Sequence, residues 1–516
     1  MALVEERELK KRGATIVKNA LANVVRGGAT AAVAVILPHF LTRSLDTDHF
    51  SAWVFILQIA AYAGYLDLGL QTAVARYLAQ AVEAGDDRLR DRLVSTALGL
   101  LTVAGLLALI IIGAIVWQLP HLLRHIPVGL MGNMRGGILV LSVSTAALLP
   151  LSTFAGILIG LQRNEHSTLA IVGTRLLGAF AVILVVRHTQ SLIWLALCIG
   201  GFNLLGGIAQ AVVVRRLLPN MRLRLGNIDR KIAVELARFC SVLTIFSIAM
   251  LLISGLDVMI VGYFNFSAVG VYSVAATLTA FFAGLNSAVF NALLSPIAIL
   301  QVRSDYGEIR RIVINATRLN TYASLLLTSV IVVFGSPLLR LWVGREYAMR
   351  ALPILIVLML GQTVRLIGSV CSWTLVAMGM QRFAIAPAAF EGFSNLALSL
   401  LGILWLGPIG VAWGTLAAAV IGLLCYIVYT IKRPEVLQLG RLEFVRECIL
   451  RPMACFSPLL LCTAFAWDRA RPSGLWLVWT LSLVVSLLIA RSKGQLLPEG
   501  LFRRAKMLRL GGDIPI

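Results

Sequence analysis

The sequence predicts an all-α protein that crosses a membrane many times. Two features of the composition support this class: the mean hydropathy is +0.89, and 59% of the residues are hydrophobic while only 13% are charged. Apolar runs of about 20 residues, the length that a helix needs to cross a bilayer, recur along the whole chain. A soluble protein of 516 residues does not tolerate such a composition.

The apolar runs predict about fourteen membrane spans. Because this number is even, both ends of the chain are expected on the same side of the membrane. We expect the spans at residues 16–41, 50–75, 93–118, 137–161, 167–186, 191–214, 236–262, 268–299, 312–338, 351–379, 383–406, 408–431, 450–467 and 474–490.

The basic residues predict which side this is. Of the 45 Lys and Arg residues, 33 lie in the segments on the side of the termini, 9 lie in the opposite loops and 3 lie within spans. Since basic loops stay in the cytoplasm, both termini are predicted to be cytoplasmic. The net charge of +21 therefore reflects topology, and no nucleic-acid partner is expected.

A weak internal repeat predicts two lobes. An offset of about 219 residues aligns Phe50–Trp53 with Val269–Tyr272, and it also aligns spans three and four with spans nine and ten. We expect six-helix lobes at 1–218 and 219–434, related by a parallel pseudo-two-fold axis along the membrane normal. Residues 435–516 would add spans thirteen and fourteen and an amphipathic cytoplasmic tail.

The sequence contains no motif for a catalytic, metal or nucleotide site. It lacks GxxxxGK[ST], HExxH and GxSxG, and its seven cysteines are single residues without a CxxC pair. We therefore expect no metal, no cofactor and no enzymatic activity.

Six charged residues lie within the expected spans, where a charge is costly and usually functional. They are Arg26, Asp67, Arg175, Asp257, Arg365 and Glu391. At 1.5 Å per residue, Arg26 lies roughly 12 Å beyond Lys18, and Asp67 lies roughly 13 Å before Arg76. The two opposite charges would thus lie at similar depth on adjacent helices, where an ion pair or a polar cavity is expected.

These charges have two interpretations. In the first, they pair with one another and fasten helices together. In the second, the three arginines and Asn23 line a cationic lumen, because guanidinium groups bind phosphate-like anions bidentately. The three acids, Asp67, Asp257 and Glu391, would then serve in energy coupling or as counter-charges.

Several short motifs, in this order and spacing, resemble the bacterial polysaccharide (O-antigen) flippase family of the multidrug/oligosaccharidyl-lipid/polysaccharide exporter superfamily. The resemblance covers nearly the whole chain. The motifs are the first helix with Asn23 and Arg26, Leu66–Leu70 followed by Ala75–Tyr77, Asp257 preceding Val269–Ser273, and Pro408–Gly414 at the start of the twelfth span.

The resemblance implies a V-shaped pair of six-helix lobes in the bacterial inner membrane. It implies alternating-access transport of an undecaprenyl-pyrophosphate-linked oligosaccharide to the periplasmic leaflet, for cell-surface or exopolysaccharide synthesis. The partners implied are this glycan lipid and the bilayer, with a polysaccharide polymerase and glycosyltransferases as further candidates. Arg26 falls where relatives place a cavity arginine, and the cationic lumen of the family agrees with Arg175 and Arg365.

Three other functions stay open at this point. A drug/cation antiporter of the same superfamily would favour acidic and aromatic cavity residues over buried arginines. A lipid-linked glycan glycosyltransferase, ligase or polymerase would carry a sizeable periplasmic loop, whereas every outer loop here is short. A flippase for the peptidoglycan precursor would differ only in its cargo.

Overall fold

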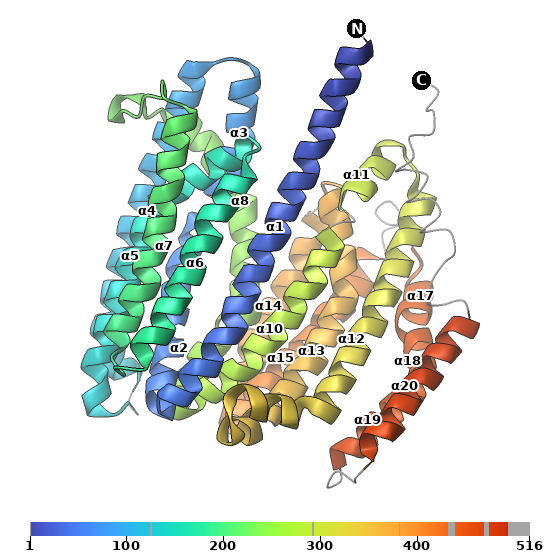
Figure 1. Cartoon of the computed structure of the whole chain (residues 1–516). Helices are drawn as coiled ribbons and strands as arrows, with labels where there is room; N and C mark the ends of the chain where they lie inside the picture. Colours follow the sequence, from blue (N-terminus) through green and yellow to red (C-terminus); the bar gives the residue numbers. More distant parts are fainter. Residues whose placement is uncertain are drawn as a thin grey trace. The chain divides into compact units, whose positions relative to one another are not determined.

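The computed structural model describes residues 2–123, 126–291, 294–380, 382–431, 439–468 and 474–493 (Figure 1). These residues form helices and short connections, without a β-strand among them. The predicted all-α class is therefore confirmed. Residues 494–516, which include most of the expected cytoplasmic tail, lie outside the described ranges.

The helices of the first half correspond to the first seven expected spans. They are α1 (Ala2–Ser44), α2 (Thr47–Gly64), η1 (Tyr65–Asp67), α3 (Leu70–Glu83), α4 (Asp87–Leu122), α5 (Val128–Gly160), α6 (Asn164–Val186), α7 (Leu192–Leu217), η2 (Leu225–Asn227), α8 (Arg230–Met250), the π-helical η3 (Leu251–Gly255) and α9 (Asp257–Phe264).

The helices of the second half correspond to the other seven. They are η4 (Phe266–Ala268), α10 (Val269–Asn291), α11 (Leu294–Val302), α12 (Tyr306–Val343), α13 (Arg345–Ala377), α14 (Arg382–Leu406), α15 (Pro408–Cys425), η5 (Tyr426–Thr430), α17 (Arg441–Phe444), η6 (Val445–Leu450), α18 (Arg451–Cys455), α19 (Ser457–Asp468) and α20 (Leu475–Ser492).

The described residues contain 12 helices that are long and apolar enough to cross a membrane, and up to 14 if each of two bent helix pairs is one span. This range includes the expected fourteen. The chain is therefore a multi-pass membrane protein.

The second span is interrupted, whereas the sequence predicted a continuous helix over residues 50–75. Helix α2 ends at Gly64, the short η1 follows, and Leu68 and Gly69 take positive φ values of 51° and 80° before α3 begins. Glycine adopts this left-handed conformation at no steric cost. The break places Asp67 at the end of a short helix in the middle of the span.

Two further spans are bent. Residues Ser247–Ile253 and Asp257–Phe264 meet at 42°, and Arg441–Cys455 and Ser457–Ala466 meet at 61°. Pro458, at the start of α19, explains the second bend because proline lacks the N–H that would continue the helix. The spans predicted at 236–262 and 450–467 are thus each bent in the structure.

The chain forms two compact units. Unit 1 comprises Met1–Gly284, Trp342–Tyr347 and Ser399–Val411, and unit 2 comprises Leu285–Leu341, Ala348–Leu398 and Ala412–Ile516. These units are defined by packing, whereas the expected lobes at 1–218 and 219–434 and the extension at 435–516 are defined by the repeat. The lobe boundaries stay a prediction.

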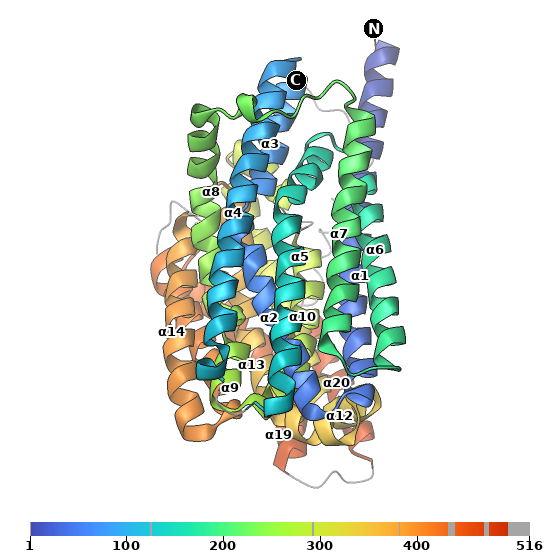
Figure 2. The ribbon, with the colours of Figure 1, turned by 90° about the vertical axis from the view of Figure 1, so that its left-hand side faces the viewer.

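Helix α5 is the centre of unit 1, where it packs against α2, α3, α4 and α7 (Figure 2). Gly156 and Gly160 allow α3 to approach closely: a Cβ atom at either glycine would lie only 2.8 Å from the carbonyl oxygen of Gln71 or 2.7 Å from that of Ala75. Small residues four apart are typical of close helix packing in membranes. Ser152, one turn earlier, lies on the same face of α5.

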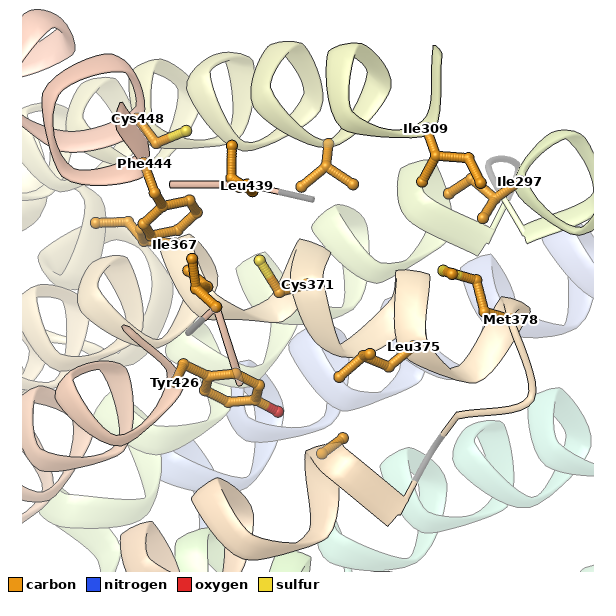
Figure 3. Packing of buried hydrophobic residues seen from close by; sticks show 13 residues of the cluster. Ile297, Ile309, Ile367, Cys371, Leu375, Met378, Tyr426, Leu439, Phe444 and Cys448 are labelled. Carbon is orange, nitrogen blue, oxygen red and sulfur yellow. The ribbon is translucent and has the colours of Figure 1, made fainter. Parts of the chain in front are cut away.

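Unit 2 has an apolar core that includes Ile367, Cys371, Tyr426, Phe444 and Cys448 (Figure 3). The Tyr426 hydroxyl is paired with Ser372, so the polar end of this ring is satisfied inside the core. A second apolar cluster of unit 2 joins α12 to helices α18, α19 and α20.

Candidate functional site

Two of the three predicted arginines, Arg26 of α1 and Arg175 of α6, lie close together in unit 1. Thr30 links them: its hydroxyl oxygen accepts a hydrogen bond from Arg175 Nη1 at 2.6 Å, and it donates one to the carbonyl oxygen of Arg26 at 2.9 Å. Residues four apart share a helix face, so Thr30 stands directly beside Arg26. The two guanidinium groups are near enough to repel each other electrostatically.

Neither arginine forms an ion pair with an acidic side chain that the structure describes. Both are half-buried, so their charges are only partly hydrated. Two like charges in such a place repel each other and favour binding of an anion.

The packing of α1 against α6 fixes this arrangement. The two helices run side by side (Figures 1 and 2), and the paired residues are always 145 to 147 positions apart, which is the register of parallel helices. Beside Thr30–Arg175, the contacts are Lys18–Glu165 at 3.1 Å, Ala22–Thr168 at 3.4 Å and Ser44–Gln190 at 3.4 Å.

The helix surface near the arginine pair is uncovered at two glycines. A Cβ atom at Gly27, next to Arg26, or at Gly173, two residues before Arg175, would have no neighbour within 4 Å. The helix backbone is therefore open to another molecule at both places. Asn23, the fourth predicted lumen residue, has a side chain outside the described part of the structure.

Asp67 is not paired with Arg26 and instead contacts α5. Its Oδ1 atom lies 3.1 Å from the hydroxyl of Ser152, which also lies 2.7 Å from the carbonyl oxygen of Leu149. Ser152 has one hydrogen and cannot donate to both. If Asp67 is protonated, its carboxyl group can donate to the Ser152 hydroxyl while Ser152 donates to the carbonyl oxygen of Leu149. Each donor among these three residues then has an acceptor.

Asp257 belongs to a buried polar cluster at the bend between η3 and α9. The Tyr272 hydroxyl donates to Asp257 Oδ2 at 3.0 Å. Just before the bend, the carbonyl oxygen of Gly255 accepts hydrogen bonds from Gln58, at 2.9 Å, and from the Tyr62 hydroxyl. These contacts hold the interrupted helix against α2 and α10, which is a structural role.

Arg365 and Glu391 form an ion pair within unit 2. Arg365 Nε lies 2.5 Å from Glu391 Oε1, and Nη1 donates to Gln362 Oε1 at 3.1 Å. The side chains are 20% and 8% exposed. The charge of Arg365 is thus compensated inside the protein, although its Nη2 is buried without a hydrogen-bond partner among the described residues.

The described residues contain no group of three or more His, Cys, Asp and Glu side chains that could hold a metal ion. The chemistry that this arrangement offers is electrostatic: an uncompensated arginine pair and a separate carboxylate at a helix break.

The sequence did not indicate that Thr30, Ser152 and Tyr272 contact the predicted charged residues. Helical spacing would have indicated Thr30, since it follows Arg26 by four residues. The small residues at 152, 156 and 160 would have indicated that this face of α5 meets another helix. Tyr272 lies in the motif Val269–Ser273 that follows Asp257, but nothing in the motif indicates that the two side chains form a hydrogen bond.

The comparisons with known proteins agree with this fold. The family model described as "Polysaccharide biosynthesis protein" matches residues 16–297. No curated protein sequence matches the chain.

Several solved structures share the fold at low sequence identity. The lipid II flippase MurJ in an inward closed conformation is 14% identical, with a TM-score of 0.67, and covers 92% of this chain and 98% of its own. An inward-facing multidrug resistance MATE family transporter of the MOP superfamily is 17% identical, with a TM-score of 0.59, and covers 81% and 95%. A MOP superfamily transporter from Pyrococcus furiosus is 14% identical, with a TM-score of 0.58, and covers 82% and 96%. The two expected six-helix lobes are consistent with these folds.

Proposed function

This chain belongs to the polysaccharide biosynthesis protein family, and on that premise we propose that it is a flippase for a lipid-linked oligosaccharide. It would move an undecaprenyl-pyrophosphate-linked glycan from the cytoplasmic to the periplasmic leaflet of the bacterial inner membrane by alternating access. The transporters and flippases that share its fold support a transport function over an enzymatic one.

The observation that carries the proposal is the uncompensated pair of Arg26 and Arg175. Guanidinium groups bind phosphate oxygens through charge-assisted, bidentate hydrogen bonds. A pyrophosphate headgroup carries negative charge on two adjacent phosphates, so it can engage both arginines and relieve their repulsion. The lipid tail would remain in the membrane while the headgroup and glycan cross.

The same observation argues against the antiporter alternative. Two positive charges without a described acidic partner repel a cationic drug, whereas an anion is attracted. Arg365 contributes less to this argument because Glu391 neutralises it. We therefore assign headgroup binding first to Arg26 and Arg175, with Asn23 and Arg365 as further candidates.

Asp67 is the candidate coupling residue. A carboxylate that can exchange a proton at membrane depth can link transport to a proton gradient. Its contact with Ser152 can form in either protonation state, and the helix break beside it supplies an element that can change shape. Glu391 is the counter-charge of Arg365, whereas Asp257 accepts a hydrogen bond from the neutral hydroxyl of Tyr272.

The orientation is part of the proposal, with both termini in the cytoplasm. Reporter fusions after Gly85, Leu225, Asp305 and Gly440 should report the cytoplasm, and fusions after Leu130 and Ala470 should report the periplasm. A periplasmic signal from residues 215–238 would overturn this orientation.

The function is tested by transport of the glycan in cells. We expect Arg26→Ala and Arg175→Ala to abolish its accumulation on the periplasmic leaflet at normal membrane abundance, and Lys at either position to restore part of it. Losing one charge-assisted contact weakens binding by about 1.5–3 kcal/mol, or roughly ten- to hundredfold. Arg187→Ala, an exposed arginine at the end of α6, is the matched control and should transport normally.

Wild-type transport by both alanine variants would refute headgroup binding by this pair. The glycan lipid that co-purifies with the wild-type protein identifies the cargo. If a peptidoglycan precursor co-purifies instead, the assignment of the binding site still holds, but the substrate is that precursor.

A further inference from the structure

The Thr30 hydroxyl forms one hydrogen bond to each of the two arginines, as a donor to Arg26 and as an acceptor from Arg175. It has a single hydrogen, which it donates to the carbonyl oxygen of Arg26 at 2.9 Å. Its oxygen must therefore act as the acceptor toward Arg175 Nη1, at 2.6 Å, since a guanidinium group only donates.

Arg175 needs such a contact to stay where it is. Its guanidinium lies near that of Arg26, and the side chain is long and flexible, so repulsion would otherwise drive the group away. The Thr30 hydroxyl is the one hydrogen-bond partner of Arg175 among the described residues.

The contact leaves the binding edge of the guanidinium free. Arginine has five N–H donors in a rigid plane, and Thr30 occupies one of them at Nη1. The edge formed by Nε and Nη2 stays available for a bidentate contact with a phosphate. The Arg26 side chain donates to no described residue, so its donors are available to a second phosphate.

We propose that Thr30 is a positioning residue that holds Arg175 beside Arg26 and thereby makes the site selective for a diphosphate over a monophosphate. This inference rests on the proposed function, because it assumes that the two arginines bind the headgroup. Beyond the proposed function, it predicts that the preference for a diphosphate over a monophosphate depends on the uncharged hydroxyl group of Thr30.

The test measures binding of geranylgeranyl pyrophosphate and geranylgeranyl monophosphate to the purified full-length protein in detergent. Thr30→Val removes the hydroxyl with little change in shape, and Thr30→Ser retains it. Thr42→Val is the matched control, because Thr42 lies on the same helix and its hydroxyl donates to the carbonyl oxygen of Pro38 at 2.8 Å, with no arginine partner in the described part of the chain.

We expect Thr30→Val to weaken diphosphate binding by about tenfold, the effect of one hydrogen bond to a charged group. Monophosphate binding should change little, so the ratio of the two affinities falls. Thr30→Ser and Thr42→Val should keep the wild-type ratio. Thr30→Ala should behave like Thr30→Val and replaces it if the valine variant is poorly folded.

A double-mutant cycle separates positioning from a general effect on the fold. In an Arg175→Ala background, Thr30→Val should cause no further loss of diphosphate binding, because the group that it positions is absent. An equal loss in both backgrounds would overturn the inference.

The outcomes distinguish this inference from the proposed function. If Arg26→Ala and Arg175→Ala lose diphosphate binding while Thr30→Val and Thr30→Ala keep the wild-type ratio, the positioning role is refuted and the arginine site stands. If both arginine variants bind as the wild type does, the site itself is refuted.

Discussion

The two units hold the three arginines that the sequence predicts within spans in opposite ways. In unit 1, Arg26 and Arg175 lie together without an acidic partner among the described side chains. In unit 2, Arg365 is held by Glu391 at 2.5 Å. An ion pair fastens helices and has little charge left to attract a ligand, whereas an uncompensated pair is costly until an anion binds it.

A second contrast follows from the internal repeat. The offset of 219 residues that aligns Phe50 with Val269 also aligns Asp67 with Asn286. Asp67 can gain or lose a proton, whereas Asn286, which donates to the side chain of Asn320, cannot. Under the proposed function, unit 1 would therefore carry the ligand and proton chemistry, and unit 2 has neutral or neutralised residues instead.

The largest expected effect is on the stability of unit 2. Glu391→Ala leaves Arg365 largely buried without its partner, which typically destabilises a protein by about 3–5 kcal/mol. Thermal unfolding in detergent should show this loss, while Arg26→Ala, which relieves the repulsion with Arg175, should unfold at the wild-type temperature or above it. Equal stability of the Glu391 and Arg26 variants would remove the contrast between the units.

A double variant tests whether the Arg365–Glu391 ion pair serves only to hold helices together. Replacing a buried ion pair by apolar residues is often neutral, so Arg365→Met with Glu391→Leu should recover most of the stability lost by Glu391→Ala. The same double variant should keep transport activity if Arg365 only fastens helices. Loss of transport in a stable double variant would assign Arg365 to headgroup binding instead.

The second-largest effect is expected on transport, when an acidic residue is introduced beside Arg175 in unit 1. Thr30→Asp gives Arg175 the counter-charge that it lacks, in the position of its present hydrogen-bond acceptor. We expect transport to fall roughly ten- to hundredfold while thermal stability stays the same or rises. Normal transport with a carboxylate there would show that the positive charge of unit 1 is not needed.

A smaller effect is expected from Asp67→Asn, which gives unit 1 the residue that unit 2 has at the aligned position. The amide still accepts a hydrogen bond from Ser152, so folding should be normal. We expect transport to slow several-fold and to lose its dependence on external pH. If the flux and its pH dependence match the wild type, Asp67 is structural.

The smallest effect is expected from Ser152→Ala. It removes one hydrogen bond to Asp67 and is expected to lower stability by about 1 kcal/mol. The matched control is Ser144→Ala, since Ser144 lies on the same helix and its hydroxyl bonds, among the described residues, only the carbonyl oxygen of Val140. A shift in the pH dependence of transport with Ser152→Ala alone would confirm that this contact tunes Asp67.

The sequence was sufficient to predict the spans because hydropathy over about 20 residues reports membrane crossing directly. It did not predict the break after Asp67, because apolar residues continue on both sides and only the positive φ at Leu68 and Gly69 ends the helix. Pro458 was a visible signal for the bend before α19, but hydropathy alone conceals it.

The sequence predicted the charged residues of the candidate site, but it did not predict which of them contact one another. Arg26 and Asp67 lie at similar expected depth, yet depth does not specify which way a side chain points around a helix. Packing of α1 against α6 turns Arg26 toward Arg175, and packing of α5 against α3 brings Ser152 to Asp67. These long-range contacts depend on tertiary structure, which a single sequence does not display.

The most direct test of headgroup binding by Arg26 and Arg175 is an experimental structure of the protein with a prenyl pyrophosphate bound. We predict that the diphosphate contacts the guanidinium groups of both Arg26 and Arg175 at about 2.7–2.9 Å, the usual length of a charge-assisted hydrogen bond. The Arg365–Glu391 ion pair should remain intact in that complex. A diphosphate bound elsewhere, without contact to Arg26 or Arg175, would show that this arginine pair does not bind the headgroup.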